Sequence, residues 1–547
     1  MKKIFLYCLP FCLLFASCSD LLDEESYSET GKGNYLNNAK EAETVLQGVY
    51  KNLANEYTYS YHLSLLFTIS TDIAQCEGSS TTSFREIPTN SHNASTSQIS
   101  RTWQQLYSAI YDANDFIETV SDRMDGWGSS DRELAAIYLG EARALRALFY
   151  FELVRWYGNV VLMTSTADSR KKDEDYEQSA AEDVYAYIEE DLKYAAEVLP
   201  WAVDDTKRTS NAYRFSKGAA LGLLAKVYCT WAGYPVRDES KWAEAEKVAR
   251  RVVESGKHRL ISDYETVWKN TCNGIWDAGE SLIEVSFYSP TGLDSDNTAG
   301  RIGKWNGVSA TTIDGERGRN AANWKVVYTF TRDWEAQNDP RMKLSIADYK
   351  YDHTLGSGPI TYFSTISSAN PSEDQKNRQR QLFTPGKWDT EKYVEAANYI
   401  VNNDKSNVNW YILRYSDVLL LFAEALNESG GSIVDAVDAV NAVRRRGFGD
   451  TKHDLSYGLS REDLREAIRK ERAYELCFEG HRKQDLIRWG IYYDRVMETA
   501  QELVNWYSNA NYAVARYIIK GRHELLPIPQ RDLDMMPKCK QNSGWGQ

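Results

Sequence analysis

The chain has 547 residues, of which 42% are hydrophobic, and a formal net charge of −14 at pH 7. This length suffices for one large core or for two to three closely packed domains. The acidic balance argues against nucleic acid as a partner, because binding it requires a field of basic residues. The five cysteines after Cys18 are scattered and form no Cys-x-x-Cys pair, so neither a disulfide framework nor a zinc site is predicted.

The N-terminus has the pattern of a bacterial lipoprotein signal. A short basic start precedes an apolar run over residues 4–15, which is too short to span a bilayer, and small residues lead to Cys18. We expect residues 1–17 to be a signal peptide and Cys18 to carry several lipid chains, as stable anchoring requires. Residues 18–35 are an acidic tether similar to those of surface-exposed lipoproteins in Bacteroidetes. The expected location is the outer membrane, lipid-anchored and facing outward; a plain secretory signal is the alternative.

Apolar residues recur at steps of three or four along several segments, which is the spacing of one helical face. These segments are residues 133–157, 181–199, 217–231, 242–253, 414–427 and 433–446, and a longer helix is expected over residues 461–489. On these stripes, core positions are expected for Trp156, Trp231, Trp242 and Trp489. Helix pairs of about 34 residues stack into a solenoid because one pair cannot bury its apolar face alone. The sequence therefore predicts a mainly α fold built on a tetratricopeptide-like helical repeat scaffold.

Two segments lack this periodicity. Residues 286–323 contain six glycines and are far longer than an ordinary connection, which is typical of functional or disordered loops. Aromatic residues lie in or beside this segment, whereas disordered segments are poor in them. A second loop, residues 75–98, is rich in Ser, Thr and Asn and carries Phe84 and Asn93. We therefore expect an ordered, loop-rich binding region.

Three blocks in the C-terminal third carry the most specific sequence. They read LRYSDVLLLFAEALN at 413–427, RKERAYELCFEGHRKQDLIRWG at 469–490 and HELLPIPQ at 523–530. Earlier segments agree with them, namely ALRA at 144–147 leading to WYG at 156–158, and RFSKGAA at 214–220. Together they resemble the SusD/RagB family of outer-membrane nutrient-binding lipoproteins over essentially the whole mature chain. On this basis residues 36–260 form an N-terminal helical region, and residues 261–547 form a C-terminal region with a loop-rich insert.

The resemblance implies four tetratricopeptide-like pairs as a rigid back and a large loop-rich face that holds an oligosaccharide. It also implies a partner, a SusC-like TonB-dependent transporter, on which such proteins sit as lids and to which they deliver the glycan. Peptide capture, as in other members of the family, is the alternative. Sugar rings stack on aromatic faces while their hydroxyls bond to polar groups at the edge. The expected ligand contacts are Trp276, Tyr288, Trp305, Trp324, Phe84 and Asn93. For each of the three tryptophans taken singly, burial in the core and a role as a stacking surface for the ligand are equally open.

A row of carboxylates in the C-terminal block invites a catalytic interpretation. Glu471, Glu475 and Glu479 are spaced by four, and paired carboxylates are the signature of glycoside hydrolysis. Residues on one helical face form a row, however, whereas hydrolysis needs two carboxylates opposed across the substrate. Arginines such as Arg482 and Arg488 interleave with the row, so we expect an ion-pair network that ties this helix to the solenoid.

Other signatures of catalysis or metal binding are absent from the sequence. It contains no His-Glu-x-x-His and no Gly-x-Ser-x-Gly motif. Asp294 and Asp296 resemble the start of a calcium loop, but Ala299 replaces the glycine at position six and no glutamate closes the loop. We expect no catalytic residue, no cofactor and no metal; a surface glycosidase using loop carboxylates is the least favoured alternative.

Overall fold

The computed structural model of the protein describes residues 35–211, 213–289, 298–313, 315–356, 360–365 and 372–546. The predicted signal peptide, Cys18 and almost all of the predicted tether lie outside these residues, as do Asp294 and Asp296. Within the described ranges, no helix combines the length and the apolar character that crossing a bilayer requires.

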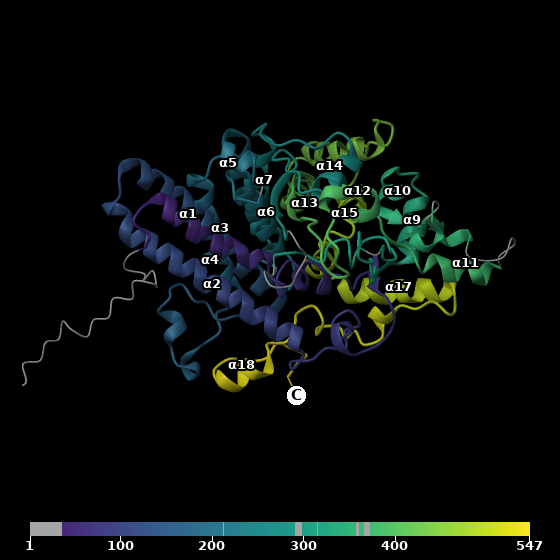
Figure 1. The fold of residues 1–547 in the computed structure, drawn as a ribbon, viewed down its shortest axis with the longest axis horizontal. Coiled ribbons are helices and arrows are strands. Elements are labelled where there is room, and N and C mark those ends of the chain that lie inside the picture. The colour runs from purple at the N-terminus through teal and green to yellow at the C-terminus, as the bar shows by residue number, and fades with distance from the viewer. Residues whose placement is uncertain are drawn as a thin grey trace, which may run out of the picture.

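A stack of helices in chain order forms the scaffold. Its first part consists of α1 (Ala39–Lys51), α2 (Ser97–Arg123), α3 (Ser129–Tyr157), α4 (Ala181–Val198), α6 (Lys217–Ala232) and α7 (Lys241–Val253). Its second part consists of α13 (Tyr415–Ser429), α14 (Ile433–Phe448) and α15 (Arg461–Glu475). Helix α3 packs between α2 and α4, α6 packs against α4 and α7, and α13 packs against α7 and α14 (Figure 1). The stack therefore continues across the long insert between α7 and α13.

Local sequence fixes where these helices begin and end. The side chain of Ser216 accepts a hydrogen bond from the amide of Ala219 at the start of α6, and Ser460 caps α15 in the same way. Helix α13 ends at Gly430, whose φ of 80° is the left-handed conformation that glycine adopts without strain. Within α6, a Cβ on Gly222 would come within 2.9 Å of the side chain of Leu413, so glycine lets α6 approach the segment around Leu413 closely.

The periodic segments before residue 450 are confirmed as helices, with α3 starting four residues earlier than predicted. The helix predicted over residues 461–489 is wrong, because α15 ends at Glu475 and α16 (Arg482–Arg488) begins only after a turn. Phe478 and Gly480 have φ values of 64° and 81°, which no α-helix accommodates. The turn brings the carboxylate of Glu479 to the buried side chain of Arg414, a contact that offsets the strained backbone.

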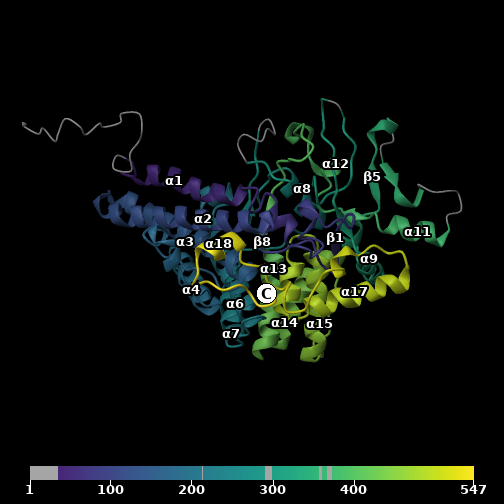
Figure 2. The same ribbon diagram turned by 90° about the horizontal axis from the view of Figure 1, so that it is seen from below.

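The insert and the loop after α1 carry short strands in two-stranded antiparallel sheets. The pairs are β1 (Ala74–Cys76) with β3 (Trp324–Val326), β2 (Ser281–Val285) with β8 (Trp410–Arg414), β4 (Ile346–Ala347) with β7 (Thr384–Pro385), and β5 (Tyr349–Tyr351) with β6 (Ile360–Tyr362). Figure 2 shows the insert, with β5, α8 (Tyr264–Cys272) and α12 (Thr390–Tyr393), on one side of the molecule, and α6, α7, α14 and α15 on the other.

The remaining α-helices are short or lie near the C-terminus. They are α5 (Thr206–Thr209), α9 (Tyr328–Glu335), α10 (Arg341–Ser345), α11 (Glu373–Arg380), α17 (Tyr492–Trp506) and α18 (Gln530–Met535). One continuous core runs from α1 to the C-terminal segment, and its largest buried side chains include Trp156, Trp268 and Trp388. The division at residue 260 stays a prediction; across it, α7 and α13 pack directly against each other.

Candidate ligand-binding face

Three aromatic rings from distant parts of the chain meet beside the insert. The ring of Trp305 lies 4.8 Å from that of Tyr61 and 5.0 Å from that of Phe84, which it meets edge to face. Tyr61 is only 5% exposed, whereas Phe84 and Trp305 are half-buried. Tyr61 therefore supports the ring of Trp305 from the buried side, and the outer parts of Phe84 and Trp305 form an aromatic surface. We call Tyr61, Phe84 and Trp305 the aromatic cluster.

Two guanidinium groups flank the aromatic cluster. Arg301 lies over the rings of Tyr61 and Trp305, at 4.7 and 5.3 Å from their centroids, and Arg85 lies 4.5 Å over the ring of Phe84. Such stacking holds a guanidinium while leaving its edge free to donate hydrogen bonds. The cluster thus combines apolar ring surface with strong donors at its border.

A carboxylate and a backbone carbonyl orient these two arginines. Arg301 donates to Glu56 at 2.7 Å, and Nε of Arg85 donates to the carbonyl of Glu77 at 2.9 Å. The carboxylates of both acidic residues remain partly exposed, as acceptors beside the donors. Donors and acceptors around an aromatic surface are the groups that a polyhydroxylated ligand needs.

One side-chain and one backbone hydrogen bond join the segments that carry Tyr61 and Trp305. The hydroxyl of Ser60 donates to the carbonyl of Ala299 at 3.1 Å, and the amide of Arg301 donates to the carbonyl of Ser60 at 3.1 Å. Close packing explains part of the glycine content here, because a Cβ on Gly307 would lie 2.3 Å from the carbonyl oxygens of Gly303 and Trp388. Packing against neighbouring segments therefore fixes the described part of the glycine-rich segment.

A buried histidine lies directly below the cluster. His62 follows Tyr61 and opens a short π-helical turn, and its Nδ1 lies 2.8 Å from the hydroxyl of Thr102. Burial, together with the charge of Arg301, lowers the pKa of His62 to about 3. The imidazole is therefore neutral at physiological pH and supplies no proton to this face.

Tyr288 extends the same face. Its side chain is 68% exposed, and its amide donates to the carbonyl of Thr298 at 3.0 Å, one residue before the contact of Ala299 with Ser60. The residues between this pair lie largely outside the described structure. An aromatic side chain this exposed, on the segment that carries the cluster, suits ligand contact better than packing.

Trp276 lies apart from the cluster. It is half-buried, and its ring meets that of Tyr213 at 5.4 Å, which in turn contacts Tyr50. Tyr50 donates to Glu141 on α3, whereas Tyr59, next to the cluster, donates to Glu152. These two acceptors are eleven residues apart, so their Cα atoms lie about 16 Å apart along α3, and Tyr50 and Tyr59 bond to different turns of that helix.

Trp324 and Asn93 are placed differently from the expectation. Trp324 lies in β3 opposite Cys76 and is only 3% exposed, so neither face of its ring is free for a sugar. Asn93 is exposed, but its side-chain oxygen accepts from the amide of Ser95 at 2.8 Å and shapes the turn before α2. The candidate face therefore keeps Phe84, Trp305 and Tyr288 and omits these two residues.

The carboxylate row of the C-terminal block is buried and paired. Glu471, Glu475 and Glu479 are at most 2% exposed, and Glu475 alone accepts from Arg341, Arg414 and Arg446. The predicted ion-pair network is confirmed, but most of its cations come from other elements. The arginines adjacent in sequence pair elsewhere, namely Arg472 with Asp417 and Asp485, Arg482 with Asp72, and Arg488 with Glu424 and Asp485.

Known families and structures match this chain over most of its length. The SusD family pattern matches residues 294–545, and a pattern described as starch-binding and associating with the outer membrane matches residues 20–229. A solved SusD homologue from Bacteroides thetaiotaomicron VPI-5482 is 54% identical, covers 95% of this chain and 100% of its own, and has a TM-score of 0.90. The chain belongs to the SusD family. The predicted family and its mainly α fold are thereby confirmed.

More distant SusD relatives span the chain as well. The SusD-like protein P25 of Formosa agariphila is 25% identical over 545 residues, which cover 95% of this chain and 94% of that protein. Surface glycan-binding protein A from Bacteroides thetaiotaomicron, solved in complex with laminarihexaose, is 20% identical. Its TM-score of 0.70, with coverage of 92% of this chain and 99% of that chain, shows a shared fold. Membership in this family of binding proteins also bears out the prediction that the chain is not an enzyme.

Proposed function

We propose that this SusD family member captures an oligosaccharide at the aromatic cluster and delivers it to a SusC-like TonB-dependent transporter. The observation that carries the ligand site is the contact of Trp305 with Phe84, flanked by the guanidiniums of Arg301 and Arg85. Solved relatives with this fold are described as laminarin-binding or as complexed with laminarihexaose, which supports a glycan as the ligand class.

Each group of the face has a part in this binding. The apolar C–H face of a sugar ring stacks on the outer parts of Trp305 and Phe84, and Tyr288 offers a further ring to the next sugar unit. Ring hydroxyls accept hydrogen bonds from the edge of Arg85 and donate to the partly exposed carboxylates nearby. A glycan bound in this way keeps its outer side in water, which suits a protein that must hand its ligand on.

Anchoring at the outer membrane completes the proposal. Lipid chains on Cys18 and a tether over residues 18–35 hold the protein at the membrane while its folded part moves relative to the transporter. The family pattern that matches residues 20–229 is described as associating with the outer membrane, which supports this location. Contact with the transporter rests on likeness to the family alone.

A ligand screen tests the proposal. Purified protein is incubated with an array of plant, algal and fungal oligosaccharides that includes laminarihexaose, and in parallel with a library of short peptides. We expect retention of at least one glycan class, loss of that retention in Trp305→Ala, and no new reducing ends. If only peptides are retained, the ligand is a peptide and the glycan proposal is wrong. Release of new reducing ends would contradict the assignment as a binding protein. The variant Trp276→Ala is the matched control, because its indole lies outside the aromatic cluster.

A further inference from the structure

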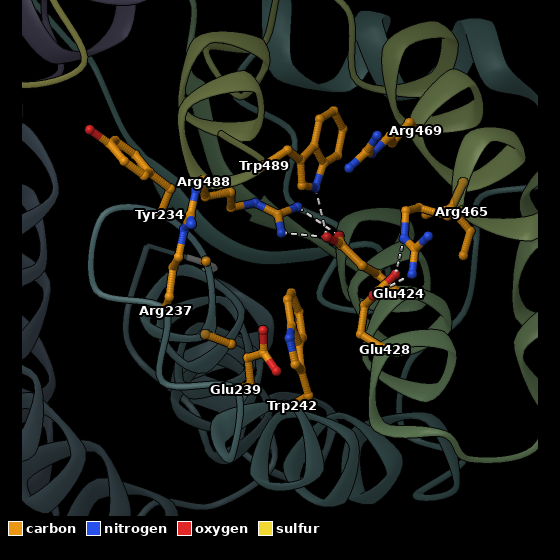
Figure 3. Close-up of a pocket in the computed structure, with 13 residues that line it drawn as sticks. Tyr234, Arg237, Glu239, Trp242, Glu424, Glu428, Arg465, Arg469, Arg488 and Trp489 are labelled. Atoms are coloured by element: carbon orange, nitrogen blue, oxygen red, sulfur yellow. Dashed lines mark hydrogen bonds and ion pairs between the residues drawn. The ribbon is translucent and has the colours of Figure 1, made fainter. Parts of the chain in front are cut away.

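A cavity of about 250 Å³ opens in the helical scaffold, and no residue of the insert lines it. Its walls are the turn between α6 and α7, one side of α13, one side of α15 and the end of α16 (Figure 3). This volume is just below the range of about 300–1,000 Å³ that is usual for drug-sized ligands, so the cavity suits a single ring. It contains none of the residues of the candidate ligand-binding face.

Ion pairs that are already complete form the floor of the cavity. Arg488 donates to both oxygens of Glu424, at 2.6 and 2.7 Å, and Nε1 of Trp489 donates to Glu424 at 2.7 Å. Arg465 pairs with Glu428 in the same two-pronged way, at 2.7 and 2.9 Å. Charges that are matched like this hold each other in place. Arg469 also lines the cavity and pairs with Glu466 at 2.8 Å, but its Nε is buried without a hydrogen-bond partner in the described structure.

The turn between α6 and α7 contributes groups that are not matched. Among the described residues, neither the guanidinium of Arg237 nor the carboxylate of Glu239 has an ion-pair partner, and Arg237 lies over the ring of Tyr234 at 5.4 Å. Trp242 lines the same cavity and is half-buried, although its helical stripe predicts a core position. Figure 3 shows Glu239 and Trp242 pointing toward the pair of Arg488 and Glu424.

Backbone contacts set the position of this turn. The amide of Tyr234 donates to the carbonyl of Arg488 at 2.8 Å. A Cβ on Gly233 would lie 2.4 Å from the same carbonyl oxygen, so only glycine allows the turn to approach α16 this closely. Main-chain contacts therefore fix the shape of the opening between the turn and α16.

The unmatched groups determine which ligand fits. A phosphate would be attracted by Arg237 but repelled by Glu239, and the reverse holds for a metal ion or an amine. A zwitterion such as L-alanine could pair with both groups but has no ring face to stack on Trp242. A neutral hydroxylated ring satisfies both, because its hydroxyls accept from Arg237 and donate to Glu239 while its C–H face stacks on Trp242. We infer that this cavity is a second binding site, specific for a single neutral pyranose unit and independent of the aromatic cluster.

Saturation-transfer NMR on the full chain tests this inference. The probes are D-glucose, D-galactose, D-mannose and D-xylose, with inorganic phosphate and L-alanine as charged comparisons. Each is used on the order of 10 mM, where a Kd of about 1 mM fills most of the sites. The site variants are Trp242→Ala and Glu239→Gln; the second removes an exposed charge without an ion-pair partner in the described fold. Glu244→Gln, in the first turn of α7 but outside the cavity, is the matched control.

We expect at least one neutral pyranose to receive saturation, with affinity reduced about tenfold in Glu239→Gln and unchanged in Glu244→Gln. Binding should persist in Trp305→Ala, which separates this site from the proposed glycan face. The inference is overturned if no neutral pyranose binds, if phosphate or L-alanine binds in its place, or if binding is lost in Trp305→Ala but retained in Trp242→Ala and Glu239→Gln.

Discussion

Arg414 and Glu475 form an ion pair in the core, with 2.6 Å between Nη1 of the arginine and Oε1 of the glutamate and no exposure of either side chain. Burial alone would raise the pKa of Glu475, but Arg446, Arg414 and Arg341 hold it well below its usual range. Removing one member of such a group leaves uncompensated charge in the interior. The pair therefore joins β8 to the end of α15, within the range that the SusD family pattern matches.

Glu475→Ala should lower the free energy of unfolding by about 3–5 kcal/mol, because several guanidiniums lose a buried partner. Urea denaturation followed by circular dichroism measures the change. Glu373→Ala on α11 is the control, because its carboxylate is 64% exposed and solvent-exposed ion pairs contribute little to stability. Equal effects of the two variants would show that the network does not stabilise the fold.

Glu284→Gln should stabilise the protein at neutral pH and not at low pH. Burial raises the pKa of Glu284 from 4.5 to about 7, while hydrogen bonds from Asn409 and Ser281 oppose the shift. The unfolded chain ionises near pH 4.5 and the folded chain near pH 7. With respect to Glu284, the protein therefore has its full stability below pH 4.5, where this side chain is protonated in both states. As the pH rises from 4.5 to about 7, the free energy of unfolding falls by on the order of 3 kcal/mol, because the unfolded chain releases this proton more readily.

The measurement for Glu284 is the urea midpoint of both proteins between pH 4.5 and pH 7. The difference between variant and wild type should grow across this interval and then level off. Glu197→Gln, at a glutamate that is 74% exposed, should show no such trend. A constant difference at all pH values would mean that the carboxyl of Glu284 ionises alike in the folded and unfolded chains.

Cys18→Ala should release the protein from the outer membrane without changing its thermal stability or ligand affinity. The lipid chains are the expected anchor, and the predicted tether precedes the described fold. Membrane fractionation and immunoblotting measure the distribution, with Ser19→Ala as the control that leaves the acylation site intact. Retention of the Cys18→Ala protein in the membrane fraction would contradict lipid anchoring at this residue.

Periodic sequence predicted the scaffold well because burial repeats every three or four residues in helices such as α7, where Ala245, Val248, Ala249 and Val252 are the buried residues. It failed at the end of α15, where residues 476–481 turn and Gly480 has a φ of 81°, although apolar residues continue past Glu475. The contact of Glu479 with Arg414, 65 residues away in sequence, stabilises that turn. Periodicity carries no information about such a partner.

The candidate site was only partly predictable for the same reason. Phe84, Trp305 and Tyr288 stood out as aromatic residues in non-periodic segments, but Trp324 occupies a similar context and is buried by strand pairing with β1. Tyr61 and Arg301 were missed. Their stacking joins residues 240 positions apart, and the only local signal is the density of tyrosines just before residue 62.

Isothermal titration calorimetry of the double variant Trp305→Ala/Phe84→Ala, with the glycan that the screen identifies, tests the central claim most directly. Both rings present their outer parts to solvent, so circular dichroism should stay helical while stacking surface is lost. We predict at least a tenfold loss of affinity, about 1.4 kcal/mol, and unchanged binding by Trp276→Ala. Normal affinity in the double variant, or loss of binding in Trp276→Ala alone, would contradict a ligand site at the aromatic cluster.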